Sequence, residues 1–221
     1  MLVTFTKRHG GFSQGVYSSL NLGDHVGDDE SLVLRNRDAL AALHGPLQFM
    51  SQVHGNRVAV IEEVTDETPT ADSLVTGIPG ITLAVMVADC IPLLLTSRQA
   101  VAAVHVGRRG LVNSVAIKTI EVMREMGAQD ISAIIGPAIC GQCYEVSADI
   151  HREVVTNFPM ADSRSKSGAL ALDLPKALSA VLQSAGISID TSQSACTVES
   201  ADLFSYRRDG VTGRQAGLVS L

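Results

Sequence analysis

The sequence predicts an α/β fold: a single domain, residues 1–221, in which a mixed β-sheet is flanked by helices. Short apolar runs rich in β-branched residues alternate with longer segments whose apolar residues recur at helical spacing. The length of 221 residues and the hydrophobic content of 46% suffice for one sizeable core. No low-complexity stretch or long linker indicates a second domain.

The strands are predicted from the apolar runs. The first strand covers residues 2–7, and the last residues of the chain, 217–221, form a closing strand. Residues 130–135 form another strand after the central helix. Six further runs are expected to be strands, buried on both faces where the apolar run is continuous: 47–53, 57–61, 73–76, 81–88, 91–96 and 101–106.

Four helices are predicted between these strands. The first begins after a cap at Asp28 or Asp29, runs to about His44 and ends at Gly45-Pro46. The second covers residues 111–126 and stops at Gly127. The third covers residues 147–157, and the fourth covers about 174–185. Residues 8–29, rich in Gly, Ser and Asn, predict a loop of a length that is usually functional or mobile.

Composition excludes several classes of protein. The net charge is −6, the pI is about 5.4, and no Lys/Arg run exceeds two residues, so the basic surface of a nucleic-acid binder is not expected. Neither a secretion signal nor an apolar run of about 20 residues is found, which predicts a cytoplasmic protein without a membrane span. The four cysteines are then expected to be reduced, so each is a metal ligand, a nucleophile or a core residue.

Three residues of types that bind zinc lie in short apolar contexts: His54 in SQVHG, Cys90 in VMVADCIPLLL and His105 in AAVHVGRRG. Cys90 follows one predicted strand, while His105 and His54 end two others, so one sheet edge can hold all three. Two imidazoles and one thiolate leave a fourth position vacant, as in catalytic zinc sites, where a bound water has a pKa of about 7. The alternative is that Cys90 is a core residue and the histidines merely end strands.

Charged residues flank these candidate ligands. Asp89 precedes Cys90 and is interpreted either as a proton-transferring group or as a hydrogen-bond acceptor that shapes the strand end. Gly107-Arg108-Arg109-Gly110 follows His105 and opens the predicted helix, so backbone N–H groups and guanidiniums can bind an anion such as phosphate there. Ordinary solvated side chains are the alternative for Arg108 and Arg109.

Six segments taken together carry a resemblance to a known family. They are RHGGFSQGVYSSLNLGDHVGDD, SQVHGNRV, ADCIPLLL, AAVHVGRRG, IGPAICGQCYEV and FSYRRDGVTGRQAGL. They span nearly the whole chain and resemble, in order, the motifs of the YfiH-like or laccase-domain (polyphenol oxidase) family, now described as purine nucleoside phosphorylases. One motif departs from the family pattern, because Val106 and Arg108 stand where alanine and tryptophan are usual. This departure concerns substrate preference more than metal binding.

The resemblance implies the site and the activity. His54, Cys90 and His105 match the family's metal ligands, with Zn²⁺ as the expected ion and copper as an alternative. The implied reaction is phosphorolysis of inosine, guanosine, adenosine or methylthioadenosine to the free base and ribose 1-phosphate, together with deamination of adenosine to inosine. Asp89 is the candidate acid in deamination, and Arg8, on a loop that can close over the site, is a substrate candidate. The candidate phosphate ligands are Arg108, Arg109, Arg208 and Arg214.

Alternative functions stay open at this point. Cys90 with His105 as base would make a cysteine hydrolase, a possibility that the related Cys/His hydrolase folds of the cytotoxic-necrotizing-factor type also suggest. A peptidoglycan-precursor editing role is another, while copper-dependent phenol oxidation needs more histidines than these motifs offer. Cys140 and Cys143 form a CxxC motif, but no second pair lies nearby in the sequence, so a packing role is predicted for them.

Overall fold

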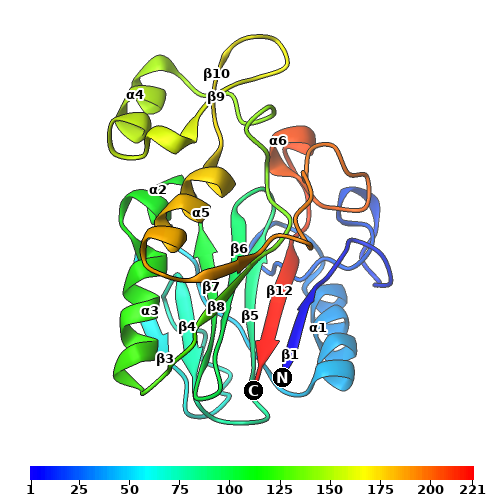
Figure 1. Cartoon of the computed structure of the whole chain (residues 1–221). Coiled ribbons are helices and arrows are strands. Elements are labelled where there is room, and N and C mark those ends of the chain that lie inside the picture. Colours follow the sequence, from blue (N-terminus) through cyan, green and yellow to red (C-terminus); the bar gives the residue numbers. More distant parts are fainter.

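The computed structural model describes residues 1–221 and contains two β-sheets packed face to face, with helices on both outer faces (Figure 1). The first sheet has the order β1-β12-β5-β2 and comprises β1 (Leu2–Phe5), β12 (Gln215–Ser220), β5 (Thr82–Val87) and β2 (Leu47–Gln48). Its first three strands pair antiparallel, and β2 pairs parallel to β5. The chain ends lie side by side, because Leu2 pairs with Ser220 (Figure 1).

The second sheet has six strands in the order β11-β8-β6-β7-β4-β3. Its strands are β11 (Ser188–Asp190), β8 (Ser132–Ile135), β6 (Ile91–Thr96), β7 (Val101–Val106), β4 (Ser73–Thr76) and β3 (Val58–Val60). The central pairs are antiparallel, while β11–β8 and β3–β4 are parallel. The predicted α/β class with mixed pairing flanked by helices is thus confirmed, with the strands divided between two sheets.

The alternation of side chains along the strands produces two layers of core, one between the sheets and one under the helices. Leu94 of β6 and Ala103 of β7 face the first sheet, where they join Val85 of β5 in the cluster between the sheets. Their neighbours Leu93 and Val104 point the other way and join the cluster under the helices. Successive strand residues point to opposite faces, so a continuous apolar run serves both layers, as the sequence predicted.

The helices cover the outer faces. α1 (Glu30–His44) lies over the first sheet, and α3 (Val115–Glu125) and α5 (Leu174–Ser184) lie over the second (Figure 1). Asp29 caps α1 by accepting a hydrogen bond from the Ser31 N–H at 2.8 Å, one of the two predicted caps. Shorter elements complete the chain: η1 (Gly15–Tyr17), α2 (Arg108–Val112), α4 (Ala148–Asn157), η2 (Pro159–Ala161), the hairpin β9 (Asp162–Arg164) and β10 (Leu170–Leu172), and α6 (Tyr206–Asp209).

Two sequence predictions of elements are wrong. The predicted strand 47–53 continues only to Gln48, since the Gln52 side chain then bonds both backbone groups of Met86, at 2.8 and 2.9 Å, in place of a strand ladder. The predicted helix 111–126 is two helices, α2 and α3, which are separated because Ser114 takes a left-handed conformation with φ 59°. The short elements β9, β10, β11 and α6 were not predicted.

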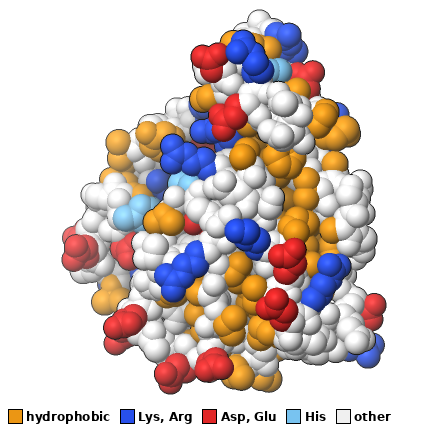
Figure 2. Space-filling view, turned by 90° about the vertical axis from the view of Figure 1, so that its left-hand side faces the viewer, with side chains coloured by type: hydrophobic (Ala, Val, Ile, Leu, Met, Phe, Trp, Pro, Cys, Tyr) orange, Lys and Arg blue, Asp and Glu red, His pale blue; other side chains and the backbone are white.

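Charged side chains of both signs are mixed on one face of the molecule. On the face covered by the α3 and α5 layer, Lys and Arg side chains alternate with Asp and Glu and form no continuous basic patch (Figure 2). None of the helices combines the length and the apolarity that crossing a bilayer requires.

Candidate active site

One strand end and two connections between strands bring the three predicted ligands together. Cys90 lies in the β5–β6 connection, and His105 is the last inward-facing residue of β7, in phase with Val101 and Ala103. His54 lies on the turn between β2 and β3, with φ 59°, and not at a strand end as predicted. The ligand atoms of these three residues all lie within 4.8 Å of one another. The predicted cluster therefore exists, with His105 held by a strand and with Cys90 and His54 held by connections between strands.

Asp72 organises this cluster and was missed by the sequence analysis. Its side chain is fully buried just before β4, and its carboxylate accepts a 2.8 Å hydrogen bond from Nδ1 of His105. The same carboxylate accepts backbone N–H bonds from Val53, His54 and Gly55, at 3.3, 2.9 and 2.6 Å. Asp72 thus fixes both the His105 ring and the His54 turn, and it leaves Nε2 of His105 free to act as a ligand.

Electrostatics favour a thiolate at Cys90. Burial opposes ionisation, but the charge of His105 and hydrogen bonds to both histidines outweigh it and lower the pKa of Cys90 to about 6. Burial likewise opposes charge on His105, yet the Cys90 thiolate and Asp72 raise the pKa of His105 to about 9. Burial would raise the pKa of Asp72, and the hydrogen bonds from His105 and the backbone lower it below its usual value. The three groups therefore stabilise one another in their charged forms.

Gly107 gives the ligand atoms their space. A Cβ atom at this position would lie 2.8 Å from Nδ1 of His54 and 3.1 Å from Sγ of Cys90. Any larger residue would therefore push into the space between the ligands. Two imidazole nitrogens and one thiolate around such a cradle suit zinc, with a fourth position left for water or substrate. The residues present fit the metal that the sequence analysis expected.

Asp89 holds the neighbouring segment in place. Its backbone has a positive φ of 97°, and one carboxylate oxygen accepts hydrogen bonds from the hydroxyls of Thr197 and Ser205, at 2.6 and 2.7 Å. The other oxygen accepts the backbone N–H of Arg207 at 2.6 Å. With both oxygens engaged, this geometry favours the hydrogen-bonding interpretation of Asp89 over proton transfer.

A cavity of about 490 Å³ opens beside the ligands. Arg207 and Arg214 line it, and each guanidinium uses only Nη1 in hydrogen bonds to backbone carbonyls. The Arg207 guanidinium carbon also lies 5.1 Å from the centroid of the Tyr144 ring, another lining residue. The remaining donors of both arginines can therefore bind an anion in the cavity. The polar lining further includes His25, Gln52, Asp89 and Tyr206.

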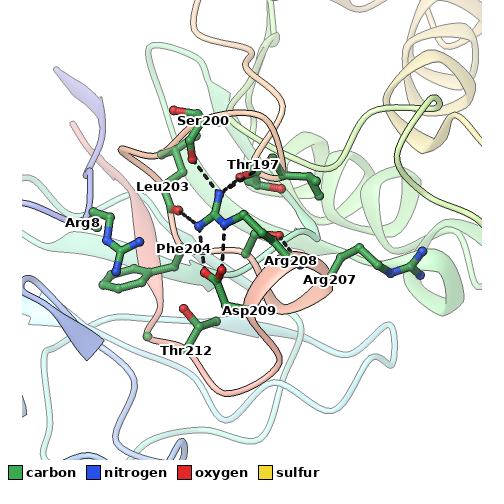
Figure 3. A network of polar contacts seen from close by, with 12 residues as sticks. Arg8, Thr197, Ser200, Leu203, Phe204, Arg207, Arg208, Asp209 and Thr212 are labelled. Carbon is green, nitrogen blue, oxygen red and sulfur yellow. Dashed lines mark hydrogen bonds and ion pairs between the residues drawn. The ribbon is translucent and has the colours of Figure 1, made fainter. Parts of the chain in front are cut away.

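The other predicted arginines do not line the cavity. Arg208 is enclosed by the carbonyls of residues 197, 198, 200 and 203 and by Asp209, which occupy its guanidinium (Figure 3). Arg8 donates to the Ser18 carbonyl at 2.9 Å and stacks on Phe204. Arg108 pairs with Glu153 at 3.3 Å, and Arg109 is exposed. Of the five substrate candidates, only Arg214 reaches the pocket.

The sequence carried a signal for one of the two missed residues, Asp72, and none for the other, Arg207. Asp72 lies two residues before Leu74 of a buried strand. A carboxylate at such a position requires a hydrogen-bonding or positively charged partner. Arg207 adjoins the predicted Arg208, and the short helix α6 determines which of the two faces the pocket. Nothing in the local sequence distinguishes them.

The fold and the site define a class of protein: two mixed sheets flanked by helices, with a His₂Cys cluster and arginines at one sheet end. The chain matches the family described as multi-copper polyphenol oxidoreductase laccase over residues 2–221, and it belongs to this family. The resemblance found in the sequence motifs is thereby confirmed.

Individual relatives and solved structures support this family membership. A protein of Corynebacterium glutamicum named purine nucleoside phosphorylase is 44% identical, with 98% of this chain and 93% of the relative covered. The crystal structure of a Neisseria meningitidis protein is similar with a TM-score of 0.90 and 39% identity, covering 99% of this chain and 93% of that one. The crystal structure of the hypothetical protein YfiH from Bacillus licheniformis has a TM-score of 0.86 and 30% identity, covering 99% and 92%.

Proposed function

We propose that the protein is a zinc-dependent purine nucleoside phosphorylase. It would convert inosine, guanosine, adenosine or methylthioadenosine and phosphate to the free base and ribose 1-phosphate, and it would also deaminate adenosine. The observation that carries the proposal is a single cavity that combines the His54–Cys90–His105 cluster with Arg207 and Arg214. The name of the Corynebacterium relative supports the same activity.

The cavity offers a complementary surface to each part of the substrates. Its volume of about 490 Å³ lies in the range of small-molecule sites. Arg207 and Arg214 are suited to phosphate, because guanidiniums bind oxyanions through paired donors. The rings of Tyr144 and Tyr206 provide apolar faces for a purine base. Gln52 is held rigidly by Met86, so its position in the cavity wall is fixed.

Phosphorolysis requires a phosphate oxygen to attack C1′ of the ribose while the bond from C1′ to the base breaks. The arginines would hold phosphate in line with that bond and stabilise its charge. The departing base takes up the electron pair and a proton, and His25, Tyr144 and Tyr206 are lining side chains that can donate one. Zinc bound by His54, Cys90 and His105 would supply Lewis acidity and an activated water, the chemistry that deamination needs.

The first test is product analysis with purified, metal-loaded protein. Inosine should give hypoxanthine only when phosphate is present, and adenosine should also give inosine. Cys90→Ala is expected to abolish both reactions while the circular dichroism spectrum stays unchanged. Arg207→Ala and Arg214→Ala should each raise the KM for phosphate about tenfold or more, as the loss of a charged hydrogen bond predicts. Arg98→Ala, on the exposed β6–β7 turn, is the matched control and should leave this KM unchanged.

Two results would contradict the proposal. One is hypoxanthine release at the same rate without phosphate. The other is near wild-type turnover by Cys90→Ala protein that has lost zinc from the His54–Cys90–His105 site.

A second candidate function rests on the chain Cys90–His105–Asp72. This order of thiolate, imidazole and buried carboxylate is that of a cysteine hydrolase, in which His105 would exchange protons with the nucleophile. Chelation separates the two candidates: a hydrolase keeps its activity without metal and loses it on alkylation of Cys90, whereas the phosphorylase loses activity on chelation.

A further inference from the structure

Outside the pocket, the fold assembles a second cluster of thiols. The CxxC motif of Cys140 and Cys143 has no partner nearby in the sequence, but the structure places Cys196 and Glu199 beside it. We propose that Cys140, Cys143, Cys196 and Glu199 form a second metal site, for zinc or another thiolate-preferring divalent ion. This inference does not rest on the function proposed for the pocket.

Two turns of the same spacing supply the ligands. In the first, the Cys143 N–H donates to the Cys140 carbonyl at 3.0 Å, which turns both thiols to one side. In the second, the Ser200 N–H donates to the Cys196 carbonyl at 3.0 Å, as the Tyr144 N–H does to the Cys140 carbonyl at 3.1 Å, and Glu199 takes the sequence position that Cys143 has in the first. Each turn thus contributes two ligands three residues apart, the ligand spacing that is common in structural zinc sites.

A β-bridge fixes the two turns against each other. Ala138 pairs parallel with Cys196, through hydrogen bonds to Ala195 at 3.0 Å and Thr197 at 3.2 Å. The ligands therefore converge because the backbone is paired next to them, and not through flexible side chains alone. Preorganised ligands of this kind need little reordering when an ion binds.

The distances suit a tetrahedral ion. The three sulfur atoms and one carboxylate oxygen lie within 4.8 Å of one another, and Sγ of Cys143 lies 3.9 Å from Oε1 of Glu199. Zinc–sulfur bonds of about 2.3 Å place tetrahedral ligands about 3.8 Å apart. Closure around an ion thus requires side-chain shifts of an ångström or less. The three cysteines are half-buried, which leaves an entry path for the ion.

The charge of the site is partly balanced by a neighbour. Three thiolates and one carboxylate around a divalent ion carry a net charge of about −2. Lys166 forms an ion pair with Glu199 and brings a positive charge to the cluster. The ammonium donates to Oε1 of Glu199, the oxygen that lies 3.9 Å from Sγ of Cys143, so a hydrogen-bonded outer partner of the kind found at metal sites is present.

An ion here would stabilise the wall of the active-site pocket. The first turn lies between Ile139 and Tyr144, which both line the cavity. The second turn includes Thr197, whose hydroxyl bonds to Asp89 and whose carbonyl accepts from Arg208 at 2.8 Å (Figure 3). The ion would link these two segments, so its role is structural and its loss would loosen the wall.

The test is to count zinc by elemental analysis after loading with Zn²⁺ and gel filtration. Wild-type protein should hold two ions per chain, and Cys90→Ala and Cys196→Ala one each. The double variant should hold none. Ser194→Ala, a variant of the same loop outside the cluster, is the matched control and should keep two. One ion in wild-type protein and none in Cys90→Ala protein would overturn the proposal.

A second measurement needs no substitution in the cluster. In Cys90→Ala protein, bound zinc should slow alkylation of Cys140, Cys143 and Cys196 at least tenfold, as measured by mass spectrometry of the separate peptides. Chelation should restore the fast rate. Equal rates with and without zinc, or an intramolecular disulfide between two of these cysteines in zinc-loaded protein, would also overturn it.

Discussion

At the scale of single residues, one buried carboxylate determines the geometry of the candidate active site. Asp72 has no exposure to solvent, and every bond that it accepts holds a metal-ligand candidate or the turn that carries one. A buried carboxylate is costly unless it is fully hydrogen-bonded, and this one is compensated by three backbone N–H groups and an imidazole. The ligands depend on Asp72 as much as on their own identity.

Asp72→Asn should therefore weaken zinc binding in the pocket. The amide keeps the size of the side chain but loses the charge that orients His105, and its NH₂ group cannot accept the bonds of the carboxylate oxygen that it replaces, such as those from Val53 and Gly55 to Oδ2. Zinc affinity, measured by competition with a chromophoric chelator in a Cys196→Ala background, should fall about 10- to 100-fold. Asp66→Asn, at an exposed position, should have no effect. An unchanged affinity in Asp72→Asn would show that the carboxylate does not support the ligands.

The acidity of Cys90 gives a pH-dependent prediction for metal-stripped protein. Burial disfavours the thiolate, but His105 and His54 overcome this and lower the pKa of Cys90 to about 6. Cys90 should thus be alkylated at a nearly constant rate above this pH and more slowly as the pH falls through it. Burial and the neighbouring thiols Cys140 and Cys196 raise the pKa of Cys143 to about 12, so its alkylation should still be rising at pH 9.

Iodoacetamide labelling followed by peptide mass spectrometry between pH 5 and 9 measures both profiles in one sample. A Cys90 rate that keeps rising tenfold per pH unit from pH 7 to 8 would exclude the thiolate–imidazolium pair.

At the scale of elements, the sequence predicted best where a regular pattern decides the structure. The runs 91–96 and 101–106 became β6 and β7 with the predicted bounds. Continuous apolar strands suit this position because one face of their sheet packs on the other sheet and the opposite face packs under the helices. The helix pattern of 111–126 was broken at Ser114 by a backbone conformation that apolar spacing does not encode. The elements β9, β10 and β11 are three residues long, too short to show a period.

The candidate site was likewise predictable in one part and not in another. Cys90 and His105 were predicted to meet because they lie at the ends of adjacent strands, and Pro92 does pair with His105 in the β6–β7 ladder. Contacts between distant segments could not be derived in this way. Asp89 meets Thr197 and Ser205 across more than 100 residues, and the β-bridge between Ala138 and Cys196 brings Cys196 to the turn that carries Cys140. Such contacts depend on the course of the connecting loops, which the hydrophobic pattern of a short segment does not determine.

At the scale of the whole molecule, the packing of the two sheets places the site at their shared edge. Alternation along β7 directs Val101, Ala103 and His105 to the inner face, and β6 directs Leu94 to the same face. The apolar inner layer thus ends in polar ligands where the sheets meet solvent. Its apolar side chains pack against Cys90 on the buried side of the site, while the loops of the chain form the cavity walls.

This arrangement predicts that stability and metal binding can be separated. Leu94 is fully buried between the sheets, and Leu94→Ala should lower the free energy of unfolding by about 2–5 kcal/mol because it leaves a cavity in a packed layer. Leu43→Ala, at a position of α1 that is 77% exposed, should change it by about 0.5 kcal/mol or less. Urea denaturation of metal-free protein measures both changes. Folded Leu94→Ala protein should still bind zinc through His54, Cys90 and His105, because the ligands are held by Asp72 and by the strand ends. If its zinc affinity falls in proportion to its stability, the site depends on the whole sandwich and not on the local contacts of Asp72.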